Sequence, residues 1–468
     1  MVVIGLIIFS SNSLLAQSTK KDIELGEKGF KLAVNTKGLY NDSAMTAYLN
    51  KVGQKLVSQL DSALFEFKFF IVVDKSPNAF ALPGGYVFIT TGLIPIIENE
   101  DELACIIGHE IIHSNNRHTI RQIRKRIIPV VLTLPIDILG AFAPGVNAAT
   151  APIKASQSLL FASYSRKFEY EVDDQGIVLA AKAGYDPMAL PDVLNRMVSF
   201  FENITGEKEK KNYFSDHPFT PDRGKNITEL AKSIKISKSN KISQNFLKEF
   251  EGVIYGDSPA KGIIINNTFL HPDIDFYVEY PDNWTIKNSD TAVTAFSPQH
   301  DAALAISLDN ANKTAEAMGK TYVKGLSKKY KKILKKSEPF KVNEAEGYLV
   351  SFQEVMFSDT TFAYVLWLPN GDNLFKITAM SNTEERKNLL KIAKSLRPLT
   401  DEEKASIKQN YIKIVVAKKG ESFEELSKRN DSKIKSDLVA IINAHQKDDK
   451  LKDGELVKIV SEREYIVK

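Results

Sequence analysis

The sequence is poor in cysteine and shows no excess of charge of either sign. Cys105 is the single cysteine among 468 residues, so no disulfide can form within the chain. The 62 Lys and Arg residues are nearly balanced by 58 Asp and Glu residues, which leaves a net charge of +4. This balance gives no argument for nucleic-acid binding, and we expect none. The length exceeds what one hydrophobic core supports and predicts two to four domains.

Long hydrophobic runs are also scarce. The first run, at residues 2–9, is followed by small polar residues and by Leu14-Leu15-Ala16. This order is typical of a signal peptide, and the run is too short to cross a bilayer. We therefore expect residues 1–16 to be a signal peptide and the protein to be exported to a bacterial periplasm. A buried N-terminal strand is the alternative.

What the sequence does contain is "HEIIH" at residues 109–113. Asn99 and Glu102 fit a capping box ahead of it, and apolar residues then recur at helical spacing, so the motif is predicted to lie on a helix. His109 and His113 are four residues apart, share one face of that helix and can bind one Zn²⁺. Glu110 can reach a water on the metal without being a ligand.

His118 needs a separate interpretation. It follows His113 by five residues, which is about 140° around a continuous helix of 3.6 residues per turn. We therefore expect it to point away from the metal, at the surface or at a helix end.

Two histidines leave a catalytic zinc one protein ligand short. "YSRKFEYEVDDQG" at residues 164–176 places Glu169 and Asp173 four residues apart on one face of a second predicted helix. That spacing fits a metal ligand and a carboxylate that accepts the free N–H of a ligand histidine. Glu171 falls on the opposite side of the helix. Taken alone, the segment would better fit a solvated acidic helix, but the HExxH motif upstream favours the metal-ligand interpretation.

Four motifs together resemble one known family. "NAFALPGGYVFITTGL", "GHEIIH", "YSRKFEYEVDD" and "HPFTPDR" stand in the order seen in zinc metallopeptidases of the HtpX, Oma and BepA type, over about residues 17–256. The resemblance implies zinc ligands His109, His113 and Glu169, the base Glu110, supporting residues Asp173 and Arg166, and substrate-binding residues Asn78, Gly84 and Gly85.

Two further features take their interpretation from the resemblance. His217 in "SDHPFT" matches a histidine that approaches the zinc and restrains activity in BepA-like members. A donor to the oxyanion and a loop histidine with no role are the alternatives. Residues 127–153 are apolar but interrupted by Pro129, Pro135 and Asp137. We expect them to form a helical hairpin with peripheral membrane contact rather than a membrane span.

The rest of the chain carries no catalytic set. Residues 261–400 alternate strand-like and helix-like segments, and "FYVEYPDNWTI" resembles the opening of PsbP-like domains. Residues 411–468 resemble a LysM-like module, which implies a contact with peptidoglycan; a purely structural appendage is the alternative. Every chemical motif precedes residue 225, so removal of residues from about 405 onward is expected to leave hydrolysis intact.

The sequence thus predicts an α+β protein. It would comprise a mainly helical, zincin-like metalloprotease domain with a small edge-strand sheet, a PsbP-like α/β domain and a small LysM-like α/β module. The expected function is a periplasmic endopeptidase with one Zn²⁺ per chain, which cleaves unfolded or misassembled envelope proteins laid along residues 86–90. The alternative is a latent or non-catalytic cell-wall-binding or chaperone protein with a structural zinc.

Overall fold

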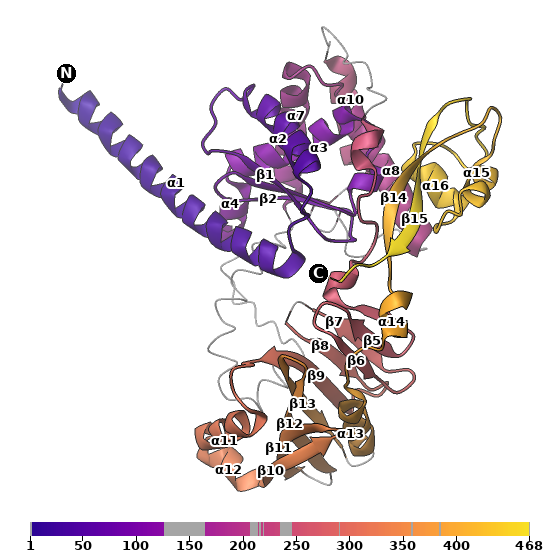
Figure 1. The fold of residues 1–468 in the computed structure, drawn as a ribbon. Helices are drawn as coiled ribbons and strands as arrows, with labels where there is room; N and C mark the ends of the chain where they lie inside the picture. The colour runs from indigo at the N-terminus through magenta and orange to yellow at the C-terminus, as the bar shows by residue number, and fades with distance from the viewer. Residues whose placement is uncertain are drawn as a thin grey trace. The chain divides into compact units, whose positions relative to one another are not determined.

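The computed structural model divides the chain into two compact units (Figure 1). Unit 1 contains Met1–Ile128, Lys154–Asp257 and Gln409–Arg463, and unit 2 contains Ser258–Lys408 and the C-terminal residues. The predicted hairpin at residues 127–153 lies outside the described residues. The structure describes residues 2–125, 164–205, 214, 217, 218, 220–234, 246–289, 291–356, 359–382 and 385–467.

Unit 1 is built on a three-stranded sheet in the order β1-β3-β2. Strand β1 (Lys68–Val72) runs parallel to β3 (Tyr86–Thr90), and β2 (Ala79–Leu82) runs antiparallel to it. Local sequence composition predicts strands at residues 67–73 and 86–90, and both are confirmed. The expectation that residues 86–90 form an edge is wrong, because β3 is the central strand and both of its hydrogen-bonding edges are occupied. The edge strands are β1 and β2.

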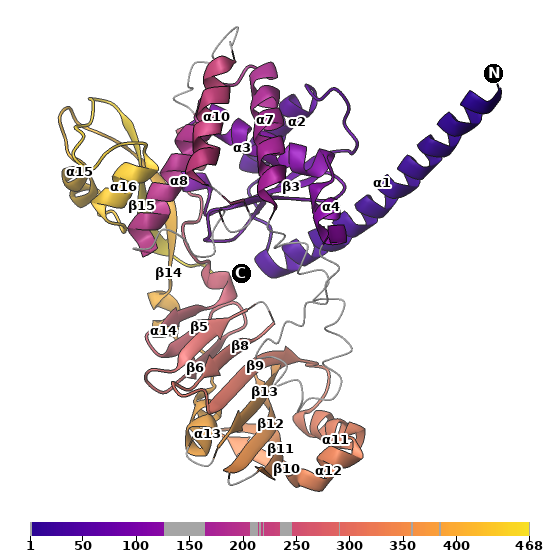
Figure 2. The same cartoon turned by 180° about the vertical axis from the view of Figure 1, so that it is seen from behind.

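Helices cover both faces of this sheet (Figure 2). The second half of α1 (Val2–Lys37) packs on one face, where Phe30 contacts the rings of Phe70, Tyr86 and Phe88. On the other face, α2 (Ser43–Val57) and α3 (Glu100–Asn115) form the main core with alternate residues of the strands. Residues 2–37 are helical, so the alternative of an N-terminal strand is wrong. None of the helices in the described ranges has both the length and the apolar composition needed to cross a bilayer.

Helix α3 begins where the sequence predicted. Asn99 is its N-cap, and its side chain accepts a hydrogen bond from the backbone N–H of Glu102 at 2.9 Å. All residues from Asp101 to Ser114 are buried. The helix contacts β2, α7 (Arg166–Lys182) and α8 (Ala189–Thr205), while α4 (His118–Lys125) follows it and α10 (Pro221–Ser233) packs on α7 and α8.

The C-terminal module is a packed part of unit 1. It consists of β14 (Lys408–Val416), α15 (Phe423–Arg429), α16 (Ser436–Ile442) and β15 (Leu456–Glu464), with β14 and β15 paired. Four of its side chains belong to the same core cluster as α3: Ile412, Leu438, Ile442 and Val460. The module therefore shares its core with the domain that carries the zinc motif.

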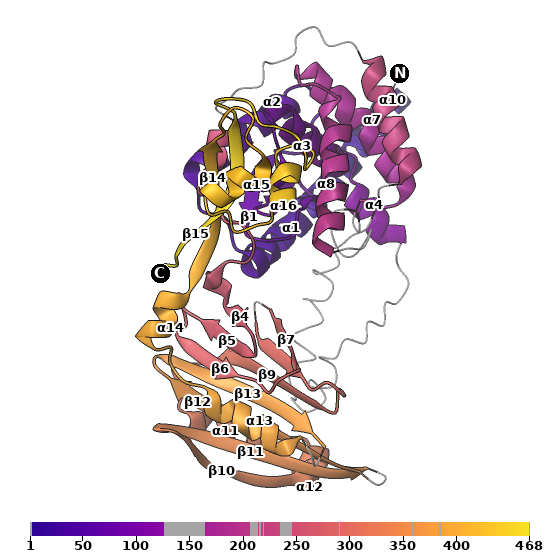
Figure 3. The ribbon, with the colours of Figure 1, turned by 90° about the vertical axis from the view of Figure 1, so that its right-hand side faces the viewer.

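Unit 2 is sheet-rich (Figure 3). Its seven-stranded antiparallel sheet has the order β10-β11-β12-β13-β9-β8-β7, and a second sheet has the order β4-β5-β6. Helices α11 (Ala315–Gly325) and α12 (Lys328–Ile333) cover one face of the large sheet, and α13 (Arg386–Ser395) packs on the other. A helical N-terminal region and a sheet-rich later region confirm the mixed α+β class. The strands are β4 (Ile263–Ile265), β5 (Thr268–His271), β6 (Phe276–Glu279), β7 (Thr285–Asn288), β8 (Val293–Phe296), β9 (Ala302–Asp309), β10 (Leu334–Val342), β11 (Ala345–Met356), β12 (Asp359–Asn370) and β13 (Asn373–Ser381).

Candidate metal centre

Four side chains from three segments of unit 1 converge on one point. His109 and His113 come from α3, Glu169 comes from the first turn of α7, and His217 precedes α10. Each offers one ligand atom, and these atoms all lie within 4.8 Å of one another. None of the four residues is more than 1% exposed. The fold therefore brings together the three ligands expected from the motifs and the additional histidine.

The spacing of the four ligand atoms fits a tetrahedral zinc. His109 Nε2 lies 3.0 Å from His113 Nε2 and 3.2 Å from His217 Nδ1. Glu169 Oε1 lies 3.3 Å from His113 Nε2 and 3.3 Å from His217 Nδ1. Ligands about 2.0–2.1 Å from a tetrahedral zinc would be about 3.3 Å from one another. Three imidazoles and a carboxylate are also donors that zinc accepts, so the residues present fit this ion.

Burial and neighbouring charges set the protonation states of the candidate ligands. Burial lowers the pKa of His113 well below its usual value, so its imidazole is neutral and has a free lone pair. Burial opposes ionisation of Glu169, but His217 and Arg223 hold its pKa well below its usual range, so it is a carboxylate. Burial also opposes a charge on His109, yet hydrogen bonds to Asp173 and Glu169 raise its pKa to about 9. Zinc binding would release that proton.

Asp173 and Arg223 contact the candidate ligands and help to hold them in position. Asp173 Oδ1 lies 3.2 Å from Nδ1 of His109, the placement that the spacing on α7 predicts. Arg223 donates to both oxygens of Asp173 at 2.7 and 2.8 Å and lies 2.7 Å from Glu169 Oε2. It also donates to the His217 carbonyl at 3.2 Å. One buried guanidinium thus holds two carboxylates and the loop of His217.

The arginine assigned from the resemblance lies elsewhere. Arg166 is exposed at the start of α7 and makes no contact with the four ligands in the described part of the chain. Arg223 stands in its place and was not assigned from the sequence, although it closes the quoted motif "HPFTPDR". The only signal was its position six residues after His217.

The structure also corrects the expectation for His118. This histidine is fully buried, and its Nδ1 lies 3.3 Å from Nδ1 of His113. Its Nε2 lies 3.4 Å from Oε1 of Glu171. The expected 140° offset assumed a continuous helix, but α3 ends at Asn115 and Arg117 has a left-handed φ of 57°. This change in chain direction starts α4 at His118 and places the imidazole of His118 against His113 of α3.

Glu110 and His217 face each other across the centre. His217 Nε2 lies 3.4 Å from Glu110 Oε1, and both residues are fully buried. His217 thus directs Nδ1 to the other ligand atoms and Nε2 to the carboxylate next to them. With this ring in place, four protein ligands surround the zinc position, and the position that a catalytic site keeps open is filled.

The predicted substrate-binding residues lie on and beside the β2–β3 hairpin. Gly84 and Gly85 form its turn with φ of 81° and 89°, and a Cβ on Gly85 would lie 2.5 Å from the Glu66 carbonyl. The turn alone therefore requires both glycines. The backbone N–H of Asn78 donates to Thr90 Oγ1 at 3.0 Å, which fixes the start of β2. These contacts hold the hairpin in shape, and no contact with the four ligands is seen in the described residues.

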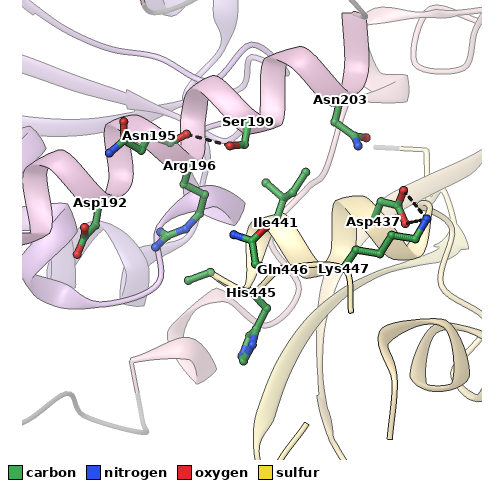
Figure 4. Close-up of a pocket in the computed structure, with 11 residues that line it drawn as sticks. Asp192, Asn195, Arg196, Ser199, Asn203, Asp437, Ile441, His445, Gln446 and Lys447 are labelled. Atoms are coloured by element: carbon green, nitrogen blue, oxygen red, sulfur yellow. Dashed lines mark hydrogen bonds and ion pairs between the residues drawn. The ribbon is translucent and has the colours of Figure 1, made fainter. Parts of the chain in front are cut away.

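A second feature of unit 1 is a pocket of about 530 Å³ between α8 and the C-terminal module (Figure 4). From α8 it is lined by Asp192, Asn195, Arg196, Ser199 and Asn203, and from the module by Asp437, Ile441, Ala444, His445, Gln446 and Lys447. Most of these side chains are polar, and none is aromatic except the histidine. The metal ligands do not line this pocket.

Comparison with known proteins agrees with the geometry. Residues 43–231 match the model of peptidase family M48. The beta-barrel assembly-enhancing protease of Escherichia coli (strain K12) is 30% identical over 39% of this chain and 38% of its own length. The mitochondrial metalloendopeptidase OMA1 of Schizosaccharomyces pombe is 28% identical over 41% of this chain and 55% of its own. The chain thus spans well under two thirds of these relatives.

The solution structure of cyanobacterial PsbP from Synechocystis is similar at 12% identity with a TM-score of 0.24, over 29% of this chain and 95% of that one. A TM-score this low does not establish a shared fold, so the PsbP-like interpretation stays a prediction. The family match, in contrast, covers α3, α7 and His217, which carry all four ligand atoms. Residues 43–231 therefore match peptidase family M48 and are similar to the beta-barrel assembly-enhancing protease and to OMA1.

Proposed function

We propose that this protein is a zinc-dependent endopeptidase. The observation that carries the proposal is the buried group His109, His113 and Glu169, with the carboxylate of Glu110 beside it. A zinc bound there supplies a Lewis acid that polarises a peptide carbonyl and acidifies water. Glu110 then acts as the general base and passes the proton to the leaving amine. Asp173 and Arg223 keep the His109 ring and Glu169 oriented for the metal.

We infer that His217 is a latch. Its Nδ1 lies where a fourth ligand belongs, and its ring stands between Glu110 and the other ligand atoms. It must move away before water and substrate can reach Glu110. The alternative of a permanently closed, structural zinc is supported by the same four-ligand arrangement. The two proposals differ in what the loss of the His217 ring does to activity.

We propose that the substrate is an extended peptide laid along β2. Strand β3 is central, while β2 is an edge strand in contact with the metal helix α3. An extended chain can add to such an edge by main-chain hydrogen bonds, which favours unfolded or misassembled proteins over compact ones. The name of the Escherichia coli relative refers to beta-barrel assembly, which supports envelope proteins as the substrate class. The proposed compartment is the periplasm, reached through the signal peptide predicted at residues 1–16.

The decisive experiment compares the wild type with Glu110→Gln in digestion of casein, with bound zinc measured in both. We expect full zinc content and no hydrolysis in the variant, because Glu110 is a base and not a ligand. Glu229→Gln, an exposed glutamate on α10, is the matched control and should digest normally. If Glu110→Gln digests casein like the wild type, the proposed mechanism is wrong.

We also propose glycan binding at the pocket between α8 and the C-terminal module. Hydroxyl, amide and carboxylate groups line it beside Ile441, and such groups hydrogen-bond to sugar hydroxyls and acetamido groups. Retention on insoluble peptidoglycan should fall in an Asn195→Ala, Gln446→Ala double variant and stay unchanged in Asn50→Ala, which lies outside the pocket. Equal retention of the wild type and the double variant would contradict the proposal that this pocket binds glycan.

A further inference from the structure

One segment of unit 2 concentrates the positive charge of the whole chain. Residues 313–341 contain ten lysines and two glutamates, with no arginine or aspartate, so their net charge is 10 − 2 = +8. The whole chain has a net charge of +4, so the remaining residues sum to 4 − 8 = −4. The net charge of the whole chain is therefore small although residues 313–341 are strongly basic. Such an uneven distribution of charge is typical of an interaction surface.

Helix α12 directs this charge outward. At 100° per residue, Lys328, Lys329, Lys331 and Lys332 occupy one side of the helix, and Tyr330 and Ile333 occupy the other. Tyr330 and Ile333 pack against the core cluster under α11. All four lysines are exposed.

Helix α11 extends the same surface. Lys320 and Lys324 are exposed and lie four residues apart, so they share one face of the helix. Lys320 is paired with Glu316 at 2.7 Å. In contrast, no carboxylate in the described part of the chain lies within ion-pair distance of Lys324 or of the α12 lysines. Figures 1 and 3 show α11, α12 and β10 gathered at one end of the large sheet. We call the exposed lysines of α11 and α12 the basic face.

Protection of a sheet edge explains only part of this pattern. Strand β10 is an edge strand, and Lys336, Pro339 and Lys341 are residues that discourage pairing with another strand. The lysines of α11 and α12 lie on helices above the sheet, so they cannot serve this purpose. They need another explanation.

We propose that the basic face binds the anionic surface of a phospholipid bilayer. A cluster of exposed lysines, most of them without a carboxylate partner, matches a surface of negative headgroups, to which each lysine adds a roughly equal attraction. Nucleic acid fits less well, because the segment contains no arginine and its Tyr322 and Tyr330 are half-buried against the sheet rather than available to stack on bases. The lysines of this face lie elsewhere in the sequence than residues 127–153, for which membrane contact was expected from the sequence.

The test measures cosedimentation of the full chain with vesicles of phosphatidylcholine, with and without phosphatidylglycerol. The test variant is Lys328→Gln, Lys331→Gln, Lys332→Gln, which leaves Lys329 and its contact with the Tyr330 ring in place. The control is Lys387→Gln, Lys391→Gln, Lys394→Gln on α13, which removes the same charge from exposed positions on the opposite face of the sheet. Thermal unfolding of all three proteins checks that each is folded.

We expect the wild type to prefer the anionic vesicles, and added salt to weaken that preference. The α12 variant should bind them at least about tenfold more weakly, since three lysines are removed, while the α13 control keeps most of its affinity. An equal loss in both variants would show attraction by net charge alone and overturn the proposal. Equal binding of neutral and anionic vesicles would also overturn it. So would binding of a DNA duplex that the α12 variant loses, without any preference for anionic vesicles.

Discussion

The ammonium group of Lys458, on β15 of the C-terminal module, lies 2.8 Å from Oε2 of Glu98 and donates to the Ile97 carbonyl at 2.7 Å. Lys458 is fully buried, and burial lowers its pKa. Glu98 and Ile97 immediately precede Asn99, the N-cap of the metal helix α3. The C-terminal module is therefore linked, through the ion pair of the buried Lys458, to the start of the helix that carries His109 and His113.

We predict that Lys458→Met destabilises unit 1 by about 2 kcal/mol, because it removes one partner of a buried pair while Glu98 keeps some access to water. Limited proteolysis should then cut the C-terminal module faster than in the wild type. Removal of residues from about 405 onward, expected from the sequence to leave hydrolysis intact, should lower the thermal stability of the peptidase domain. Lys452→Met, an exposed change in the same module, is the control. Unchanged stability in Lys458→Met would contradict the coupling.

Arg223→Gln should weaken zinc binding by roughly 10- to 100-fold, the usual cost of losing a residue that orients metal ligands. The variant leaves Glu169 and Asp173 without their shared cation. Arg223→Lys should recover little of the lost zinc affinity, because an ammonium cannot reproduce the paired hydrogen bonds to Asp173. Competition with a chelator measures the affinity. Arg166→Gln changes an exposed residue of α7 and should bind zinc with normal affinity. If Arg166→Gln lost more zinc affinity than Arg223→Gln, Arg166 would be the residue that supports the ligands.

Gly176→Ala should destabilise the protein by about 1–3 kcal/mol through overpacking. Gly176 of α7 approaches α3 so closely that a Cβ would lie 3.2 Å from both Cα and N of His109. The helices must therefore separate slightly at the ligand itself, and zinc affinity should fall with stability. Gly325→Ala meets no atom within 4 Å and should be neutral or stabilising. Thermal unfolding and zinc titration of both variants check this, and a neutral Gly176→Ala would show that α7 can shift freely.

His217→Ala should raise basal cleavage of an unfolded substrate and leave the zinc content unchanged, because three protein ligands remain and the fourth position opens. Steady-state rates and metal analysis on the same samples measure both quantities. A fall in kcat with little change in KM would instead indicate that His217 donates to the oxyanion. Wild-type rates in the variant would mean that the ring has no role in turnover.

We expect Glu403 to contribute to the loss of stability of unit 2 at low pH. Hydrogen bonds from Arg397 at 2.7 and 2.8 Å hold the pKa of Glu403 at about 2, below its usual value of 4.5. The unfolded chain binds this proton first as pH falls, so the stabilisation is complete above pH 4.5 and is lost between 4.5 and 2. Glu403→Gln should therefore flatten the loss of stability over that range.

Tryptophan fluorescence isolates this measurement, because both tryptophans of the chain, Trp284 and Trp367, lie in unit 2. Denaturant unfolding at several pH values gives the stability of that unit. Glu402→Gln, exposed in the first turn of the same helix, α14 (Asp401–Ser406), serves as the control and should keep the wild-type slope. The same slope in Glu403→Gln would show that the Arg397 pair contributes nothing to the acid response.

The sequence by itself determined the features that depend on short spacing. Asn99 and Glu102 predicted the start of α3, and residues four apart on one helix placed His109 with His113, and Glu169 with Asp173. These follow from the geometry of a single helix, which is independent of the rest of the fold. Strands were likewise predicted from local composition at residues 67–73 and 86–90, and the structure has them at Lys68–Val72 and Tyr86–Thr90.

Only the tertiary structure decided the remaining features, because each joins segments far apart in the chain or depends on one backbone angle. The pairing order of the sheet made β2, not β3, an edge strand. The left-handed residue Arg117 returned His118 to the metal helix, although helical periodicity predicted the opposite. Arg223 reached Asp173 across 50 residues, and Lys458 reached Ile97 across 361. Such contacts form when helices and strands pack, and no local pattern encodes them.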